Sequence, residues 1–207
     1  MKNILCFGDS NTWGCKPGVL TRFPLDVRWT GVLAGLLGED YNIIEDGING
    51  RTTVYDDPNA LFRNGLSSLG YSLYRAKPLD LVVIMLGTND LNFTDAEGYS
   101  QGIKMLSKQI LMSEILFTGT SPVFKNKPRI LLVSPIEMVP PVKPTACEES
   151  KKLVYYNEKV ADELGVDWLD AAKYGVASTA DGCHMEGKYH AVLAEAIAEK
   201  IREMDLQ

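Results

Sequence analysis

The stretch LDLVVIMLGTND, residues 79–90, joins a long apolar run to a polar end. Every residue from 81 to 86 is apolar, which is typical of a strand buried on both faces. Such strands belong to parallel sheets covered by helices on two sides. The polar residues 87–90 lie at the carboxyl end of this strand, where open α/β sheets bind ligands. The stretch therefore predicts a fold class and the place of a site.

Further apolar, β-branched runs alternate with segments of helical periodicity along the rest of the chain. The predicted strands are residues 3–7, 41–45, 79–86, 129–134 and 166–169. The predicted helices are residues 29–37, ended by Gly38, and residues 64–75, 96–116, 148–164 and 186–204. This alternation predicts an α/β fold, a three-layer α/β/α sandwich around a five-stranded parallel sheet.

The chain reads as a single domain over residues 1–207. No internal repeat, low-complexity tract or Gly/Ser-rich linker divides it. Residues 135–144 carry four prolines after the fourth strand and predict a stiff, ordered loop at the carboxyl edge of the sheet. This loop is either a plain connection or a part of the substrate pocket.

Composition excludes several classes of function. The net charge of −6 and the absence of a basic stripe argue against nucleic-acid binding. No apolar run approaches the roughly 20 residues of a membrane helix, and residues 4–7 are too short for a secretory signal, so we expect a cytoplasmic protein without a membrane partner. The four cysteines fit reduced thiols, and two histidines six residues apart are too few for a typical zinc site.

Ser10, His184 and Asp181 are residues of the types that nucleophilic catalysis needs. Ser10 follows the first strand and would be the nucleophile. His184 would be the general base, and Asp181, three residues earlier, can turn back to the imidazole Nδ1 and fix its tautomer. Each residue also has a plain alternative, because Ser and Asp are common in turns and at helix N-caps.

An oxyanion hole can be assembled at the same edge of the sheet. Its candidate donors are the backbone N–H groups of Ser10 and Gly50 and the side-chain amide of Asn89. The alternative interpretations are a turn glycine at position 50 and an Asx turn at position 89. His190, in the predicted last helix, is interpreted as a packing or surface residue.

Four blocks in order make the chain resemble the SGNH hydrolases, also called GDSL esterases. They are Gly8-Asp9-Ser10, Gly50, Gly87-Thr88-Asn89-Asp90, and Asp181-x-x-His184. The resemblance implies strand order 2-1-3-4-5, with Ser10, His184 and Asp181 as the catalytic triad and no metal or organic cofactor. The wider context, including residues 26–33 and 50–53, resembles the bacterial arylesterase and perhydrolase subgroup.

That subgroup resemblance implies hydrolysis of small acyl, acetyl or aryl esters and assembly into a homo-oligomer. The expected substrate-binding residues are Asn11, Trp13 and Cys183. Position 11 is Asn where the subgroup commonly has Leu, which predicts a more polar pocket wall beside Ser10. The exposed aromatic residues near Trp13, Phe23 and Trp29 are candidates for subunit contacts.

The function predicted from the sequence is that of a serine esterase acting on a small-molecule ester. Two alternatives use the same acyl-enzyme: an acyltransferase or perhydrolase, and a carbohydrate acetylesterase. A third is a binding module in which the triad is incidental. A binder needs neither a serine after the first strand nor Asp-x-x-His, so the sequence favours the enzyme.

Overall fold

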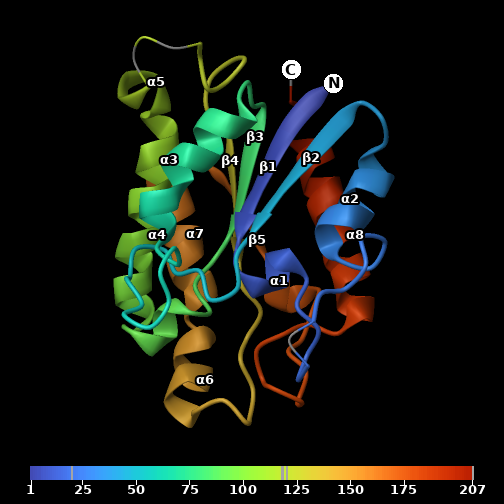
Figure 1. Cartoon of the computed structure of the whole chain (residues 1–207), viewed down its shortest axis with the longest axis vertical. Coiled ribbons are helices and arrows are strands. Elements are labelled where there is room, and N and C mark those ends of the chain that lie inside the picture. Colours follow the sequence, from blue (N-terminus) through green and yellow to red (C-terminus); the bar gives the residue numbers. More distant parts are fainter. Residues whose placement is uncertain (20, 118, 120, 207) are drawn as a thin grey trace.

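The computed structural model describes residues 1–19, 21–117, 119 and 121–206, and it has the three layers predicted (Figure 1). The five strands are β1 (Lys2–Gly8), β2 (Tyr41–Gly47), β3 (Leu81–Met85), β4 (Ile130–Ser134) and β5 (Asp167–Asp170). They form one parallel sheet in the order β2-β1-β3-β4-β5, as the resemblance implied. All carboxyl ends therefore lie at one edge, which points downward in Figure 1.

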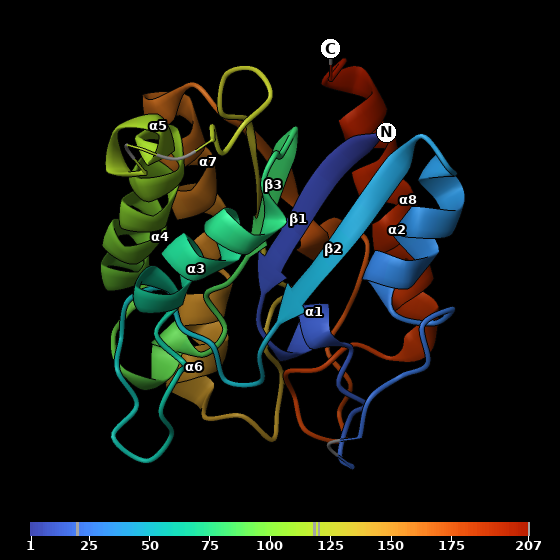
Figure 2. The same cartoon turned by 45° about the horizontal axis from the view of Figure 1, so that its top comes forward.

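Helices cover both faces of this sheet. One layer holds α2 (Trp29–Leu37) and α8 (Gly187–Glu203), which pack against each other. The other holds α3 (Gly65–Ala76), α4 (Ala96–Leu111) and α7 (Leu153–Leu164), and Figure 2 shows the two layers on opposite sides of the strands. The short helices are α1 (Ser10–Trp13), α5 (Ser113–Leu116) and α6 (Pro144–Ser150), with 3-10 turns η1 (Asp90–Asn92) and η2 (Ala171–Lys173).

Two hydrophobic cores lie on the two sides of the sheet because strand side chains alternate. In β1, Ile4 and Cys6 face α2 and α8, whereas Leu5 and Phe7 face the opposite helices. All four are at most 1% exposed. Such double burial explains the unbroken apolar runs that identified the sheet.

Two predicted helices are each divided in the structure. The helix predicted over residues 96–116 ends at Leu111, because Met112 takes φ −95° and ψ 7° before α5 begins. The helix predicted from residue 148 begins earlier, at Pro144, and is interrupted at residues 151–152. Proline is favoured in the first helical turn, so Pro144 begins α6 instead of ending the predicted loop over residues 135–144.

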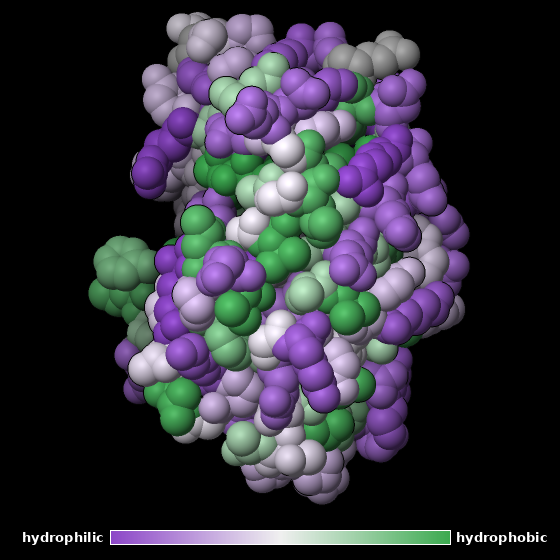
Figure 3. All heavy atoms as spheres, turned by 90° about the vertical axis from the view of Figure 1, so that its right-hand side faces the viewer, coloured by the Kyte–Doolittle hydropathy of each residue, from purple (hydrophilic) through white to green (hydrophobic). Residues whose placement is uncertain are grey.

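The side of the molecule formed by α2 and α8 shows hydrophobic residues lying among hydrophilic ones (Figure 3). The expectation of exposed aromatic contacts is wrong for Trp29, which is 1% exposed. Phe23 packs edge-on against His190, with 5.3 Å between ring centroids.

Within the described residues, no helix combines the length and the apolar character needed to cross a bilayer.

Candidate active site

Ser10 stands at the first position of α1, directly beyond the carboxyl end of β1. The Asp9 side chain caps this short helix by accepting a hydrogen bond from the Asn11 N–H at 2.9 Å. Helix α1 lies so close to the end of β2 that a Cβ on Gly47 would be 2.2 Å from the Trp13 backbone nitrogen. The turn therefore holds the Ser10 hydroxyl at the edge of the sheet.

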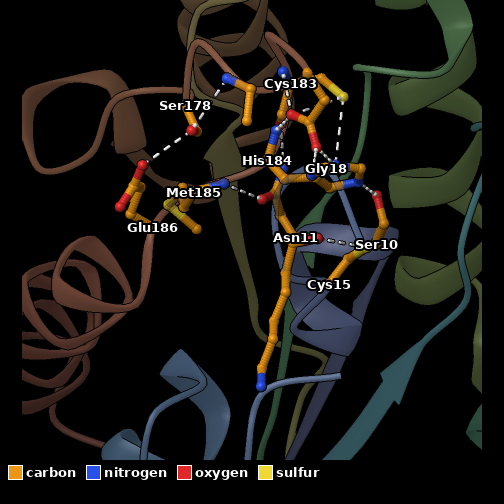
Figure 4. Close-up of polar contacts among 12 residues, drawn as sticks. Ser10, Asn11, Cys15, Gly18, Ser178, Cys183, His184, Met185 and Glu186 are labelled. Atoms are coloured by element: carbon orange, nitrogen blue, oxygen red, sulfur yellow. Dashed lines mark hydrogen bonds and ion pairs between the residues drawn. The ribbon is translucent and has the colours of Figure 1, made fainter. Parts of the chain in front are cut away.

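His184 and Asp181 come from the loop before α8 and meet Ser10 there. Figure 4 shows His184 and Ser10 in this region. His184 Nε2 lies 2.9 Å from Ser10 Oγ, and His184 Nδ1 lies 2.9 Å from Asp181 Oδ2. The three predicted residues thus form one continuous hydrogen-bonded chain. A hydroxyl bonded to an imidazole that is oriented by a carboxylate is the arrangement of an activated nucleophile.

The Asp181 carboxylate accepts hydrogen bonds from several further donors. The Gly18 N–H donates to Oδ2 at 2.7 Å, and the N–H groups of Cys183 and His184 donate to Oδ1 at 3.2 and 3.1 Å. Burial alone would raise the pKa of Asp181, but the hydrogen bonds from His184, Gly18 and Cys183 outweigh it and lower the pKa to about 2. Asp181 therefore stays ionised over the working range of an imidazole base.

The loop that carries Asp181 and His184 is supported by the proline-rich segment after β4. Gly182 takes φ +79°, and a Cβ there would lie 2.1 Å from the Val139 carbonyl oxygen. Its own carbonyl accepts a hydrogen bond from the Val139 N–H at 2.9 Å. Glycine is thus required between Asp181 and His184, both by its conformation and by its close approach to the neighbouring loop.

Asn11 has a different place from the one predicted. Its Nδ2 donates to the Cys183 carbonyl at 2.9 Å, and its Oδ1 accepts from the Met185 N–H at 3.0 Å. With 2% exposure, the side chain is a buried bracket between α1 and the His184 loop rather than an open pocket wall. Its effect on the site is to position His184 against Ser10.

We predict that Asn11→Asp lowers both stability and turnover. A carboxylate can still accept from Met185, but its second oxygen would face the Cys183 carbonyl without a hydrogen between them. Urea unfolding should show a loss of about 1–3 kcal/mol, the usual cost of an unpaired buried polar group. Turnover at 25 °C should fall about tenfold or more, because the base is displaced from the nucleophile. Unchanged turnover would remove the positioning role.

The predicted oxyanion donors lie around the same edge. Among the described residues, the N–H groups of Ser10 and Gly50 have no hydrogen-bond acceptor within the protein. Asn89 Nδ2 donates to the Arg51 carbonyl at 3.1 Å and approaches Asp9 Oδ2 at 3.4 Å. These contacts orient the Asn89 amide, and two backbone donors are left free for a developing oxyanion.

Arg51 is a supporting residue whose role the sequence pattern did not predict. Its side chain is 1% exposed, and its guanidinium carbon lies 3.9 Å from the centre of the Phe7 ring. It donates to the Gly8 carbonyl at 3.0 Å and to Asp46 Oδ1 at 2.8 Å, tying the ends of β1 and β2 together. The only hint in the sequence was an arginine in the turn directly after a strand.

Two buried carboxylates lie behind the site. Burial raises the pKa of Asp9 to about 6, against the lowering effect of the Asn11 N–H. Burial likewise raises the pKa of Asp90 to about 7, although Thr53 donates to this carboxylate through its hydroxyl and its N–H. Asp90 therefore joins the loop after β2 to the end of β3.

The other two predicted substrate-binding residues are Trp13 and Cys183, and each has a defined contact in the structure. The Trp13 ring packs under Arg22, whose guanidinium carbon is 5.3 Å from the ring centre. Cys183 Sγ lies 3.5 Å from His184 Nδ1, on the acid side of the imidazole rather than beside Ser10. Burial and the Asp181 charge raise the pKa of the Cys183 thiol to about 12, so it is not a competing nucleophile.

His190 is a buried packing residue, which confirms one of the two interpretations given to it. Its ring is inaccessible, and Nδ1 accepts a hydrogen bond from the Trp29 N–H at 3.3 Å. Burial, and secondarily the nearby His184, lower the pKa of His190 to about 4. It therefore stays neutral where an exposed histidine would be protonated.

This shift predicts an acid-side loss of stability. Between pH 6.5 and 4 the unfolded chain binds a proton at His190 that the folded chain does not, so stability falls as pH falls through this window. In urea titrations at pH 7.5 and 4.5, His190→Asn should flatten that decline by up to about 3 kcal/mol. Asparagine keeps an acceptor for the Trp29 N–H and does not titrate, so the quantity to compare is the change of unfolding free energy with pH. Parallel slopes would contradict the prediction.

The sequence profile of the GDSL-like lipase/acylhydrolase family matches residues 6–192. Among solved structures, the aryl esterase of M. smegmatis is 36% identical, with 100% of both chains covered and a TM-score of 0.91. Est24, a carbohydrate acetylesterase from Sinorhizobium meliloti, is 34% identical, with 99% of this chain and 100% of that chain covered and a TM-score of 0.91. A search of curated proteins finds no match.

Proposed function

The chain belongs to the GDSL-like lipase/acylhydrolase family and is a carboxylic ester hydrolase, and we propose that it cleaves small acetyl or aryl esters through an acyl-enzyme on Ser10. The observation that carries this proposal is the chain of contacts from Ser10 Oγ to His184 Nε2 and from His184 Nδ1 to Asp181 Oδ2, each 2.9 Å long. In this arrangement Ser10 can give its proton to His184 Nε2, and Asp181 can stabilise the imidazolium that forms.

In the acylation half, Ser10 Oγ attacks the ester carbonyl carbon while its proton moves to His184 Nε2. The carbonyl oxygen becomes negative, and we assign its stabilisation to the N–H groups of Ser10 and Gly50 and to the Asn89 amide. His184 then gives the proton to the leaving alcohol as the carbon–oxygen bond breaks, which leaves an acyl group on Ser10. Asp181 stabilises the imidazolium between these two transfers.

The deacylation half repeats the same transfers with water. A water molecule gives one proton to His184 Nε2 while its oxygen attacks the acyl carbon. Collapse of the second tetrahedral intermediate breaks the bond to Ser10, and His184 returns the proton to the serine oxygen. The products are a carboxylic acid and an alcohol, and the enzyme is restored.

The proposed substrate class draws on the similar structures and on the site. One similar protein is described as an aryl esterase and another as a carbohydrate acetylesterase, so an acetyl group is the acyl part we propose. The same acyl-enzyme would serve an alcohol acceptor, and product analysis with added methanol separates transfer from hydrolysis.

The test measures turnover of p-nitrophenyl acetate, butyrate and octanoate, and of acetylated xylose, by the purified protein. We expect the highest kcat/KM for an acetyl ester. A serine-directed phosphonate should label one serine per chain, and peptide mass spectrometry should place the label on Ser10. Ser67→Ala, a change on the exposed surface of α3, is the matched control. Labelling elsewhere, or no turnover of any ester, would refute the proposal.

A further inference from the structure

Three side chains with metal-binding atoms converge on the acid side of His184. Asp181, Cys183 and His184 each offer one ligand atom, and these atoms lie within 4.8 Å of one another. Cys183 Sγ is 3.5 Å from His184 Nδ1 and 3.8 Å from Asp181 Oδ1, and Nδ1 is 2.9 Å from Asp181 Oδ2. Figure 4 shows Cys183 and His184 side by side above Ser10.

These separations are close to those of the donors around one zinc ion. Zinc binds sulfur at about 2.3 Å, nitrogen at about 2.0–2.1 Å and oxygen at about 2.0–2.2 Å in tetrahedral geometry. Two donors at such lengths and angles are about 3.3–3.6 Å apart. The 3.5 Å between Cys183 Sγ and His184 Nδ1 already matches this separation. The two Asp181 distances run to different oxygens of the carboxylate, so the carboxylate has to turn until one oxygen faces both of the other donors. Three protein ligands leave the fourth tetrahedral position for a water molecule.

The cluster is reachable from solvent and is held by the backbone. The Asp181 side chain is 20% exposed and the His184 side chain 10% exposed. Cys183 is half-buried, whereas the thiols of Cys6 and Cys15 are fully buried. The loop is fixed by the Asn11 bracket and by the contact between Gly182 and Val139. A cation would therefore meet ligands that are already assembled.

We propose that Asp181, Cys183 and His184 form an inhibitory site for a thiophilic divalent cation such as Zn²⁺ or Cd²⁺. A thiol and an imidazole favour such ions over Mg²⁺, which prefers oxygen ligands in octahedral geometry. The cation is an inhibitor and not a resident cofactor. Counting histidines in the sequence did not reveal the site, because two of its ligands are a cysteine and an aspartate.

Binding at this site would stop the general base. Asp181 binds as the carboxylate it already is, and Cys183 binds as a thiolate after releasing its proton to the buffer. His184 binds through Nδ1, so the single proton of the neutral ring moves to Nε2. Nε2 can then no longer accept the proton of Ser10. The bound form has lost one proton to solvent, and its nucleophile has no base.

Equilibrium dialysis against buffered zinc chloride tests the site without using activity. We expect one zinc per wild-type chain that Cys183→Ser and Cys183→Ala bind at least about 100-fold more weakly. Cys147→Ser removes a buried thiol that contacts the Val142 carbonyl instead, and it should bind zinc like the wild type. Equal zinc affinity in the wild type and both Cys183 variants, or no zinc bound by the wild type, would overturn the proposal.

Kinetics test the inhibition, which rests on the proposed esterase function. Each protein is compared with its own metal-free rate on p-nitrophenyl acetate. The rates of the wild type and Cys147→Ser should fall in proportion to zinc occupancy and recover when EDTA is added. Mg²⁺ should leave these rates unchanged. The Cys183 variants should keep their rates at the same zinc concentration. Full occupancy without loss of rate would refute the inhibition. An absence of esterase activity in the metal-free protein would refute the proposed function, while dialysis would still decide the metal site.

Discussion

Replacing Ser10 by alanine should lower kcat for p-nitrophenyl acetate by about 10⁴- to 10⁶-fold. The substitution removes the one hydroxyl that contacts His184 Nε2, so no acyl-enzyme can form. Ser10 is 6% exposed and its side chain donates no other hydrogen bond in the described structure, so the fold should keep its melting temperature within a few degrees. The measurement is steady-state kinetics with a burst assay for released nitrophenol.

A second variant makes this expectation sharper. His184→Ala should cost a similar factor, and Ser10→Ala combined with His184→Ala should be no worse than either alone, because the two residues act as one unit. If the kcat loss of the double variant equalled the product of the two single losses, the residues would act independently, and this would contradict their joint role in forming the acyl-enzyme. Turnover that persists unchanged in all three variants would mean that hydrolysis depends on neither Ser10 nor His184, and it would refute the proposed mechanism.

The second large effect is expected for Asp181→Asn, with kcat falling by about 10⁴-fold. The amide oxygen can keep the hydrogen bonds from the Cys183 and His184 N–H groups. The amide nitrogen would then occupy the place of Oδ2 and donate to His184 Nδ1, which forces the ring proton onto Nε2. In that tautomer the imidazole cannot accept the proton of Ser10.

The same substitution should also disturb the loop that contains Gly18. Gly18 donates its N–H to Asp181 Oδ2 at 2.7 Å, so an amide nitrogen there would place two donors against each other. Urea unfolding should show a loss of about 1–3 kcal/mol. Asp181→Glu is the control, because it keeps the charge and the acceptors but moves them. A full retention of kcat in Asp181→Asn would remove the acid from the proposed mechanism.

Local patterns in the sequence were sufficient to predict the sheet and to single out Ser10, Asp181 and His184, which the structure brings into contact. The apolar runs marked strands buried on two faces, and the spacing of Asp181 and His184 let one turn join acid to base. The carboxyl ends of parallel strands then had to bring Ser10 to the same edge. The strand order came from the family resemblance.

Features that depend on distant partners could not be predicted. Arg51 reaches the Gly8 carbonyl across 43 residues, and Gly18 reaches Asp181 across 163. The bracket made by Asn11 also closes over more than 170 residues, so its sequence position suggested a pocket wall instead. The helix breaks at Met112 and at residues 151–152 contain neither Gly nor Pro, which left no local signal.

The contact between Ser10 and His184 joins residues 174 positions apart. All five strands and the loop before α8 must therefore be synthesised before His184 can reach Ser10. Hydrolytic activity then becomes a reporter of native assembly, and refolding can be followed through the return of turnover. In a partly synthesised chain, Ser10 has no contact with His184 and should be no more reactive than an ordinary serine hydroxyl.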